Sequence, residues 1–427
     1  MRRLLTLGLR GTRRLSGFAA STILQAVASL ILIPTVVGAG GLSTWSSVVL
    51  AQALGQVAAT VVGLGYGVTG PVIVSRVTPE AGVDYFRVAQ RTRCVVAVPC
   101  FALLIAAMYI IPNPNPTAGL LGGASAAIGA LSAMFFYVGR AAPIWLLMAE
   151  TAPRVILTLA GALSLALGAP LLIGLSLPTL GTALAIAVSY LSIRMSADQP
   201  KVGRGKLTFC NLCVELRTQI GPAGTVALRG IREAIPVLVV QAVAAELVGA
   251  YGLFDRLLRQ AFVALTPIST TLQGWVPRRM AIDNNARSAV TAMLVGLIIA
   301  SVTIPLFALL ASPLITWLSA GTTTPTIAEA SLCGAAISTS MLISVIGHAC
   351  LVPLGSIGGV IFGNVAGIFS VLIALPLTLS LDDSVTGALA AVVLANVVQI
   401  IVQLAVMRHR IAKGPAESSL RGLGISS

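Results

Sequence analysis

The sequence predicts an all-α, polytopic membrane protein with about twelve transmembrane helices, arranged as two six-helix bundles around a central cavity. Apolar residues make up 57% of the 427 residues, and Asp, Glu, Lys and Arg together only 9%, against about 25% in an ordinary soluble domain. The mean hydropathy is +0.97, so the chain lacks the charge that a soluble surface needs. The apolar residues also gather in runs of about 20, the length of a membrane-spanning helix.

The spans are the apolar runs between charged or Pro- and Gly-rich breaks. Within the second run, the stretch 63–67 (Gly-Leu-Gly-Tyr-Gly) predicts a bend, and the weakest of the separating breaks is the stretch 353–355 (Pro-Leu-Gly). The predicted spans are 15–37, 43–73, 94–111, 118–138, 153–170, 177–195, 221–245, 248–274, 288–311, 327–350, 354–380 and 385–407.

The distribution of basic residues predicts the orientation of these spans. The first 14 residues hold five Arg, whereas the loops assigned to the outside hold no Lys or Arg. The positive-inside rule therefore places both termini in the cytoplasm and the chain in the cytoplasmic membrane. On this assignment the early cytoplasmic loops contain Arg76, Arg87, Arg91, Arg93, Arg140 and Arg154.

The net charge of +14 indicates contact with anionic headgroups of the membrane lipids. Nucleic acid is not an expected partner, because no segment between the spans is long enough to form a soluble binding module. The one sizeable polar insert divides the chain at its middle. We predict an N-terminal bundle (1–195), a basic cytoplasmic linker (196–219), a C-terminal bundle (220–407) and a cytoplasmic tail (408–427).

The two bundles show signs of an internal repeat. Trp45 and Tyr251 stand 206 residues apart, as do Pro71 and Pro277 at the ends of the helices that follow. Six helices per half keep the same orientation in both halves, so the repeat would be parallel, about an axis along the membrane normal.

Charged residues inside the seventh and eighth spans form the candidate substrate site. A charge at the centre of a membrane helix costs at least about 2.5–3.5 kcal/mol, so these side chains should face protein or a water-filled cavity. Each helix carries one acid four residues from an Arg, which leaves about two Arg without an acidic partner. The residues are Arg229, Arg232, Arg256 and Arg259, with Glu233 and Asp255 as charge partners.

The guanidinium fork of Arg suits phosphate. The surplus positive charge therefore predicts a site for a phosphate- or diphosphate-bearing substrate. The alternative interpretation is an Arg–acid network that holds the seventh and eighth spans together.

Amide side chains offer a second, weaker set of candidates for lining the cavity. They are Gln25, Gln52, Gln56, Asn364, Asn396, Gln399 and Gln403. Hydrogen bonds between helices are the favoured interpretation of such amides, and His348 is interpreted as a packed side chain. Cys210 and Cys213 have no second pair and no nearby His, which predicts no metal site. No catalytic residue and no cofactor is predicted.

The layout of the chain is similar to that of the Wzx-type lipid-linked oligosaccharide flippases of the MOP (multidrug/oligosaccharidyl-lipid/polysaccharide) superfamily. The similarity rests on two six-helix halves, Gly-x-Tyr/Trp before the second helix of each half, and Arg on spans seven and eight, with the best local stretch at 248–257 (Val-Gly-Ala-Tyr-Gly-Leu-Phe-Asp-Arg-Leu). The resemblance implies a V-shaped pair of bundles with a cationic cavity lined by helices one, two, seven and eight. A polyprenyl-diphosphate-linked glycan would cross there by alternating access, for cell-surface polysaccharide synthesis, alongside other polysaccharide-assembly membrane proteins.

The chain departs from the related lipid II flippases in its N-terminal half. Those relatives carry Arg on early helices and tend to have fourteen helices, whereas the early helices here offer only Gln25, Gln52 and Gln56. Lipid II is therefore not the expected substrate.

Three other functions are weighed against the flippase. A MATE-like cation or drug exporter would need an intramembrane acid without a basic partner, and the N-terminal helices are expected to contain no acid. A polytopic glycan polymerase or glycosyltransferase would need carboxylates or basic residues in an outer loop, and the loop 38–42 has neither. A major-facilitator carrier would have an Asp-Arg-x-Gly-Arg-Arg-like cluster after its second helix, where this chain reads Val-Ser-Arg-Val-Thr-Pro-Glu (74–80). The chain is therefore expected not to be an enzyme.

Overall fold

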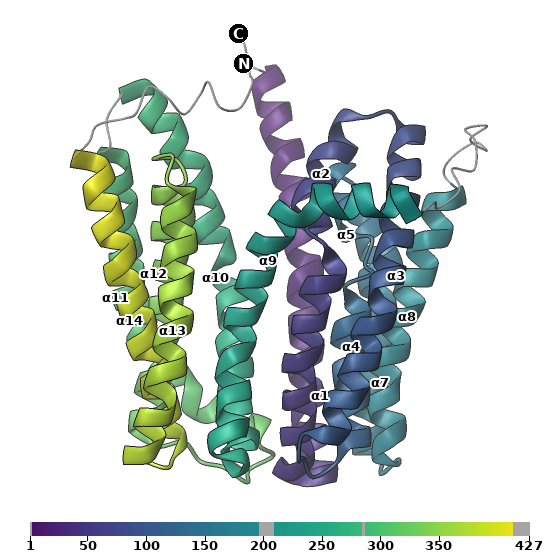
Figure 1. The fold of residues 1–427 in the computed structure, drawn as a ribbon, viewed down its shortest axis with the longest axis vertical. Helices are drawn as coiled ribbons and strands as arrows, with labels where there is room; N and C mark the ends of the chain where they lie inside the picture. Colours follow the sequence, from purple (N-terminus) through teal and green to yellow (C-terminus); the bar gives the residue numbers. More distant parts are fainter. Residues whose placement is uncertain (1, 196–208, 284–286, 413–427) are drawn as a thin grey trace. The chain divides into compact units, whose positions relative to one another are not determined.

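The computed structural model describes residues 2–195, 209–283 and 287–412 (Figure 1). Every element in these ranges is helical, as predicted. The predicted spans lie mainly on helices, although the second and the fourth are each divided between two of them. Nine helical segments among the described residues are long and apolar enough to cross a membrane, and the longest of them, Gly17–Arg76, covers two predicted spans. The predicted linker from 196 to 208 and the predicted tail from 413 to 427 lie outside the described residues.

The chain forms two compact units. The first comprises Met1–Ala234 with Leu318–Ala320, and the second comprises Ile235–Trp317 with Gly321–Ser427. The boundary falls inside helix α9 (Phe209–Val243), whose start is helical where the sequence predicted the end of the linker. The first part of α9 packs against the first unit: the Thr69 hydroxyl donates to Gln219 Oε1 at 3.3 Å, and Gly230 lies directly against Thr60.

The first two predicted spans form α1 (Arg2–Gly63) and α2 (Tyr66–Arg76). α1 turns sharply at Gly41, where φ is 73° and ψ is 173°, so the predicted outer loop 38–42 is a single tight turn. The predicted bend in the second span is confirmed, since Leu64 and Gly65 both have positive φ (48° and 75°) and separate the two helices. Gly65 adopts this conformation without steric cost.

The third predicted span begins earlier than expected. α3 (Pro79–Ile110) starts directly after Thr78, whose side chain accepts a hydrogen bond from the backbone of Ala81, and Pro79 occupies the first helical position. Both features are strong helix starts. Arg87, Arg91 and Arg93, which the sequence assigned to a loop, therefore lie on α3.

The fourth and fifth predicted spans are interrupted. The fourth consists of α4 (Pro116–Gly129) and α5 (Met134–Gly139), with turns between them. The fifth consists of α6 (Pro143–Leu146), a π-helical turn η1 (Leu147–Thr151) and α7 (Ala152–Ala166). This span begins ten residues before its predicted start of 153, so that Glu150 falls inside it. The sixth span is α8 (Leu171–Met195).

Close contact between α1 and α4 holds the first unit together. A side chain on Gly123 would place its Cβ 2.9 Å from the Cβ of Ala51, and one on Gly122 would lie 2.8 Å from Val48. Small residues that let two backbones approach are typical of helix pairs in membranes, where dispersion contacts replace the hydrophobic effect.

Replacing Gly123 by valine is therefore expected to destabilise the first unit by about 1–3 kcal/mol, because the new methyl groups force α1 and α4 apart. The apparent melting temperature in detergent measures the effect. Gly129→Val is the matched control, since no atom lies within 4 Å of a Cβ placed at Gly129 on the same helix. Equal melting temperatures for the two variants would contradict the prediction.

The second unit contains the remaining spans. After the rest of α9 and a short 3₁₀ turn η2 (Ala245–Leu247) come α10 (Val248–Asp283), α11 (Arg287–Leu318), α12 (Ile327–Ser344), the π-helical η3 (Val345–Leu351), α13 (Ile357–Leu381) and α14 (Val385–Ala412). A capping box of Thr326 and Glu329 starts α12. The weakest predicted break is confirmed, because a turn separates η3 from α13.

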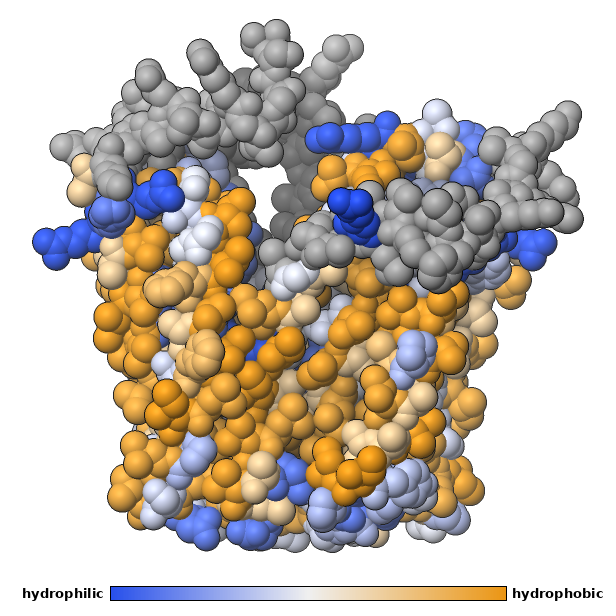
Figure 2. All heavy atoms as spheres, viewed as in Figure 1, coloured by the Kyte–Doolittle hydropathy of each residue, from blue (hydrophilic) through white to orange (hydrophobic). Residues whose placement is uncertain are grey.

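The exposed surface of the helices is apolar. Large side chains such as Leu103, Leu309 and Ile373 are 69–78% exposed. On the face drawn in Figure 2, apolar residues cover the middle of the helices and polar residues gather toward their ends. Trp45 and Tyr251, the residues that suggested the repeat, are both buried at the start of a long helix, one in each unit.

Candidate functional site

The charged residues predicted on the seventh span lie on α9. Arg229 Nε donates to Glu233 Oε1 at 2.9 Å, one helical turn away, and both side chains are exposed, at 61% and 39%. Exposed pairs of this kind contribute little to stability. Arg232 is half-buried on the same helix. All three residues belong to the first unit.

The charged residues predicted on the eighth span lie on α10, in the second unit. Arg259 donates two hydrogen bonds to the carboxylate of Asp255, one from Nε at 2.7 Å and one from a terminal nitrogen at 3.3 Å. Arg256 differs from its neighbour. Its Nε is buried and has no hydrogen-bond acceptor, and among the residues that the structure describes it forms no hydrogen bond or ion pair. The stretch 255–259 of α10 therefore holds one ion pair and one Arg that forms neither a hydrogen bond nor an ion pair with the described residues.

Arg229 and Arg232 thus belong to one unit, and Arg256 and Arg259 to the other. That the four guanidinium groups line a common cavity and bind substrate stays a prediction. Each unit supplies one helix with an ion pair between residues four apart and one further Arg. On α9 the further Arg is Arg232, and on α10 it is Arg256.

The predicted amides of the second unit join helices to one another. Asn396 on α14 donates to the hydroxyls of Thr339 and Ser340 on α12 at 3.0 and 3.1 Å. Gln399, also on α14, donates to Asn364 on α13 at 2.9 Å. Hydrogen bonds between helices were the favoured interpretation of these residues. Gln403 is buried beside Gly347 and Gly363, and neither end of its amide has a partner among the described residues.

The predicted amides of the first unit behave differently from one another. Gln25 on α1 donates to the hydroxyl of Thr151 in η1 at 3.2 Å. Gln52 and Gln56, on the second part of α1, are half-buried, and neither forms a hydrogen bond within the described parts of the chain. Because they are half-buried and not fully enclosed, both amides remain available to a polar ligand.

A buried polar cluster in the first unit was not predicted from the sequence. It surrounds the break between α4 and α5, where the helix leaves backbone groups without their usual partners. Arg93 on α3 donates to the carbonyl oxygens of Ala130 and Ser132 at 2.9 and 3.1 Å, and Gln90 donates to that of Leu131 at 2.9 Å. Arg93 is 3% exposed, and its guanidinium carbon lies 4.9 Å from the centre of the Phe135 ring.

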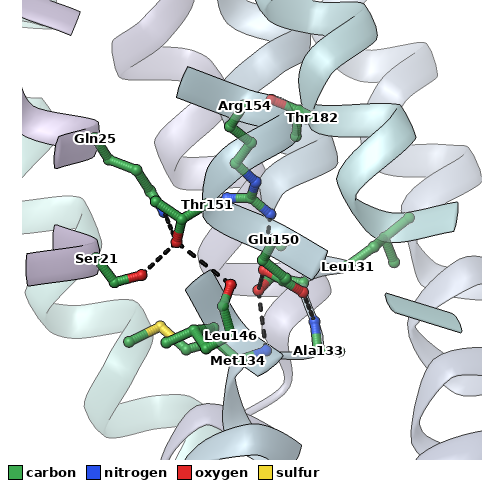
Figure 3. Close-up of polar contacts among 12 residues, drawn as sticks. Ser21, Gln25, Leu131, Ala133, Met134, Leu146, Glu150, Thr151, Arg154 and Thr182 are labelled. Atoms are coloured by element: carbon green, nitrogen blue, oxygen red, sulfur yellow. Dashed lines mark hydrogen bonds and ion pairs between the residues drawn. The ribbon is translucent and has the colours of Figure 1, made fainter. Parts of the chain in front are cut away.

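Glu150 serves the other side of the same break. Its carboxylate accepts hydrogen bonds from the backbone N–H of Ala133 and the hydroxyl of Ser132. It also pairs with Arg154 on α7 at 3.1 Å. Figure 3 shows Glu150 between Arg154 and the backbone of Ala133, with both groups directed at its carboxylate.

Thr151, next in the chain, ties the cluster to α1. Its hydroxyl contacts that of Ser21, accepts from Gln25 and donates to the carbonyl oxygen of Leu146 at 3.4 Å (Figure 3). The π-helical turn η1 shifts the backbone hydrogen bonding of the helix by one residue, since the N–H of Ala152 donates to the carbonyl oxygen of Leu147, five residues earlier. Such turns are frequent at functional positions in helices.

The cluster corrects two expectations. The N-terminal helices do contain an acid, because Glu150 lies on η1 within the candidate span Pro143–Ala166. They also contain a buried Arg, because Arg93 lies within the candidate span Pro79–Ile110. Both residues stood near the edge of an apolar run in the sequence. The signal that could have revealed Arg93 is the helix start at Thr78-Pro79, which places this residue four turns inside α3.

Replacing Arg93 by lysine is expected to destabilise the first unit by about 1–3 kcal/mol. A single ammonium group cannot reach both carbonyl oxygens of the break, so a buried acceptor is left unsatisfied. Thermal unfolding in detergent measures the effect, with Arg91→Lys on the exposed side of the same helix as the control. A melting curve of Arg93→Lys that overlays the wild type would contradict this role.

Comparisons with known proteins place this fold. No protein-family model matches the sequence, and no curated protein matches it. Among solved structures, a multidrug resistance MATE family transporter of the MOP superfamily, in an inward-facing conformation, is 16% identical with a TM-score of 0.62 over 92% of this chain and 96% of that chain. The lipid II flippase MurJ, in an inward closed conformation, is 11% identical with a TM-score of 0.65 over 96% and 93%.

A third similar structure is a complex of the MATE multidrug transporter DinF-BH, which is 17% identical with a TM-score of 0.56 over 93% of this chain and 95% of that chain. At these identities the likeness shows the fold alone. The chain is a multi-pass membrane protein with the fold of MOP-superfamily transporters, as the resemblance of its sequence implied.

Proposed function

We propose that this protein is a flippase that moves a polyprenyl-diphosphate-linked oligosaccharide across the cytoplasmic membrane by alternating access, for cell-surface polysaccharide synthesis. Its termini would lie in the cytoplasm, and it would work beside other membrane proteins of polysaccharide assembly. The observation that carries the proposal is Arg256 on α10, the predicted eighth span, a cation that forms no ion pair with any acid among the described residues.

The chemistry of the substrate explains why such a cation is needed. A diphosphate and its sugars cannot enter hydrocarbon without partners, because burying an unpaired charge is prohibitively costly. Guanidinium groups fixed in a cavity would replace the water around the diphosphate. Arg256 would provide the free charge, and the Asp255–Arg259 pair would provide donors that can be shared with a phosphate oxygen.

Gln52 and Gln56 support the proposal from the first unit. Both amides are half-buried on α1, one helical turn apart, with no hydrogen bond to other described residues. Amides in this state suit the hydroxyl groups of sugars, since they offer both donors and acceptors. The isoprenoid tail needs no polar site and would remain in the bilayer.

A cation or drug exporter of the MATE type is the second candidate, favoured by the buried carboxylate of Glu150 in the first unit. Exporters of cations need an acid that is free to bind a cation or a proton. Glu150 is engaged by Arg154 and by the backbone of Ala133, and Arg256 would repel a cation. We therefore propose the flippase first.

The experiment that separates the two is depletion of the protein from its host cells, followed by mass spectrometry of the lipid extract. Accumulation of one polyprenyl-diphosphate oligosaccharide supports the flippase and identifies its cargo. Re-expression of the wild-type chain should clear that pool, and re-expression of Arg256→Gln should not. An unchanged lipid pool together with slower efflux of a cationic dye would overturn the flippase in favour of the exporter.

A further inference from the structure

A groove opens between α3 and α8 on the surface of the first unit, with a volume of about 530 Å³, within the range of about 300–1,000 Å³ that is usual for ligand pockets. α3 lines it with Gln90, Arg91, Cys94 and Val95, and α8 with one face that includes Ala183, Ala187 and Tyr190. The groove is open because Ala183 and Ala187 have small side chains, and a larger residue at either position would fill it. The walls are apolar except at one end.

The position of Arg91 along α3 places that end at the edge of the bilayer. Arg91 stands 19 residues before Ile110, the last residue of α3, which is about 28 Å at 1.5 Å per residue. Tyr190 stands 19 residues after Leu171, the first residue of α8, again about 28 Å. The hydrocarbon core is about 30 Å thick, so a membrane whose far boundary lies at Ile110 and Leu171 would end near Arg91 and Tyr190, on the side of the basic loops predicted from the sequence.

The groove therefore runs from that boundary into the hydrocarbon. Tyr190 closes the polar end by contact with Phe86, ring centres 6.2 Å apart, a position typical of aromatic residues at a membrane interface. On α3, Cys94 and Val95 line the groove one helical turn further in than Arg91. On α8, Ala187 and Ala183 line it at increasing distance from Tyr190. A ligand with a polar head and an apolar tail fits this order of residues.

The charge at the mouth of the groove is positive. Arg91 is exposed and forms no ion pair with any residue that the structure describes, and no acid lines the groove. Arg194, near the end of α8, is exposed on the same side. The nearest acid on α3 that could compensate, Asp84, is already paired with Arg87 at 3.2 Å.

We propose that this groove binds an anionic glycerophospholipid of the leaflet on the basic side of the membrane. Arg91 would bind its phosphate, and one acyl chain would occupy the groove beside Cys94, Ala183 and Ala187. The inference does not rest on the proposed function, since the groove lies within the first unit and uses none of the residues assigned to the transported substrate. It makes the protein dependent on the lipid composition of its membrane.

Native mass spectrometry of the purified full-length protein tests the proposal. The protein is titrated with phosphatidylglycerol and, separately, with phosphatidylcholine of the same acyl chains, and the first bound lipid is counted. The wild type is expected to prefer phosphatidylglycerol by about fivefold, the effect of one basic residue at an anionic headgroup. Arg91→Gln should abolish that preference, whereas Arg76→Gln, an exposed Arg outside the groove, should retain it.

A second variant tests the apolar part of the site. Ala187→Leu is expected to weaken the first binding of both lipids, because the leucine side chain occupies the space of the acyl chain. It carries no change of charge, so a loss there cannot be electrostatic. Size-exclusion profiles of the variants, compared with the wild type, show that each is folded.

Three results would overturn the proposal. Equal lipid preferences of Arg91→Gln and Arg76→Gln would show that the anionic lipid binds elsewhere. Unchanged binding in Ala187→Leu would show that no acyl chain enters the groove. Displacement of phosphatidylglycerol by a lower concentration of polyprenyl phosphate would assign the groove to the isoprenoid carrier instead.

Discussion

Replacing Glu150 by alanine is expected to lower the stability of the protein by about 3–5 kcal/mol, the usual effect of removing one partner from a buried ion pair. The carboxylate is 2% exposed and is bonded to Arg154, Ser132 and the backbone of Ala133. Its loss would leave the Arg154 guanidinium group, which is 19% exposed, and the peptide N–H of Ala133 without this partner, and leaving buried polar groups unpaired is costly. Thermal unfolding of the purified protein in detergent measures the effect.

Two further variants separate charge from hydrogen bonding at this position. Glu150→Gln keeps an acceptor for the N–H of Ala133 but replaces with an NH₂ group the oxygen that accepts from Ser132 and Arg154. It should therefore be less damaging than alanine. Combining it with Arg154→Gln should restore part of the stability, which a double-mutant cycle quantifies. If Glu150→Ala melts like the wild type, the cluster does not hold the α4–α5 break together.

Replacing Arg256 by glutamine is expected to reduce transport by at least tenfold while leaving the melting temperature unchanged. A hydrogen bond from a charged group is worth about 1.5–3 kcal/mol, so its loss in the bound or transition state slows transport by about 10- to 150-fold. Stability should not change, because Arg256 has no partner to lose within the described residues. Flipping of a fluorescent or radiolabelled lipid-linked oligosaccharide in proteoliposomes measures the rate.

Matched controls make this result specific. Arg256→Lys keeps the charge and should retain part of the transport activity. Arg279→Gln removes an exposed charge near the end of the same helix and should leave the transport rate unchanged. Arg259→Ala is less informative, because it strands the carboxylate of Asp255 and alters the fold as well. Wild-type transport by Arg256→Gln would rule out Arg256 as a substrate ligand.

The sequence predicts the membrane helices well because hydrocarbon imposes one strong rule. Every backbone group in the bilayer must be paired, so long apolar runs become helices whatever their neighbours are. Even the bend at Leu64-Gly65 and the weak break before Ile357 could be read from local residues, since glycine and proline limit the conformations of the chain directly.

The buried cluster could not be predicted in the same way. Arg93 and Glu150 stand near the ends of apolar runs, where the sequence is equally consistent with loops. Whether such a residue is exposed or buried depends on which backbone groups of another segment need it, here those at the α4–α5 break. That requirement appears only when helices distant in the chain pack together, and the interruption of α4 by residues 130–133 has no strong local signal.

The α4–α5 break also imposes an order on biosynthesis. Its freed carbonyl groups depend on Gln90 and Arg93, which precede it in the chain, whereas the N–H of Ala133 depends on Glu150, which follows it. As the chain leaves the ribosome, the carbonyl side can be satisfied at once, and the amide side must wait until the next helix has been inserted. The fourth span therefore reaches its final hydrogen bonding only once the fifth span is present.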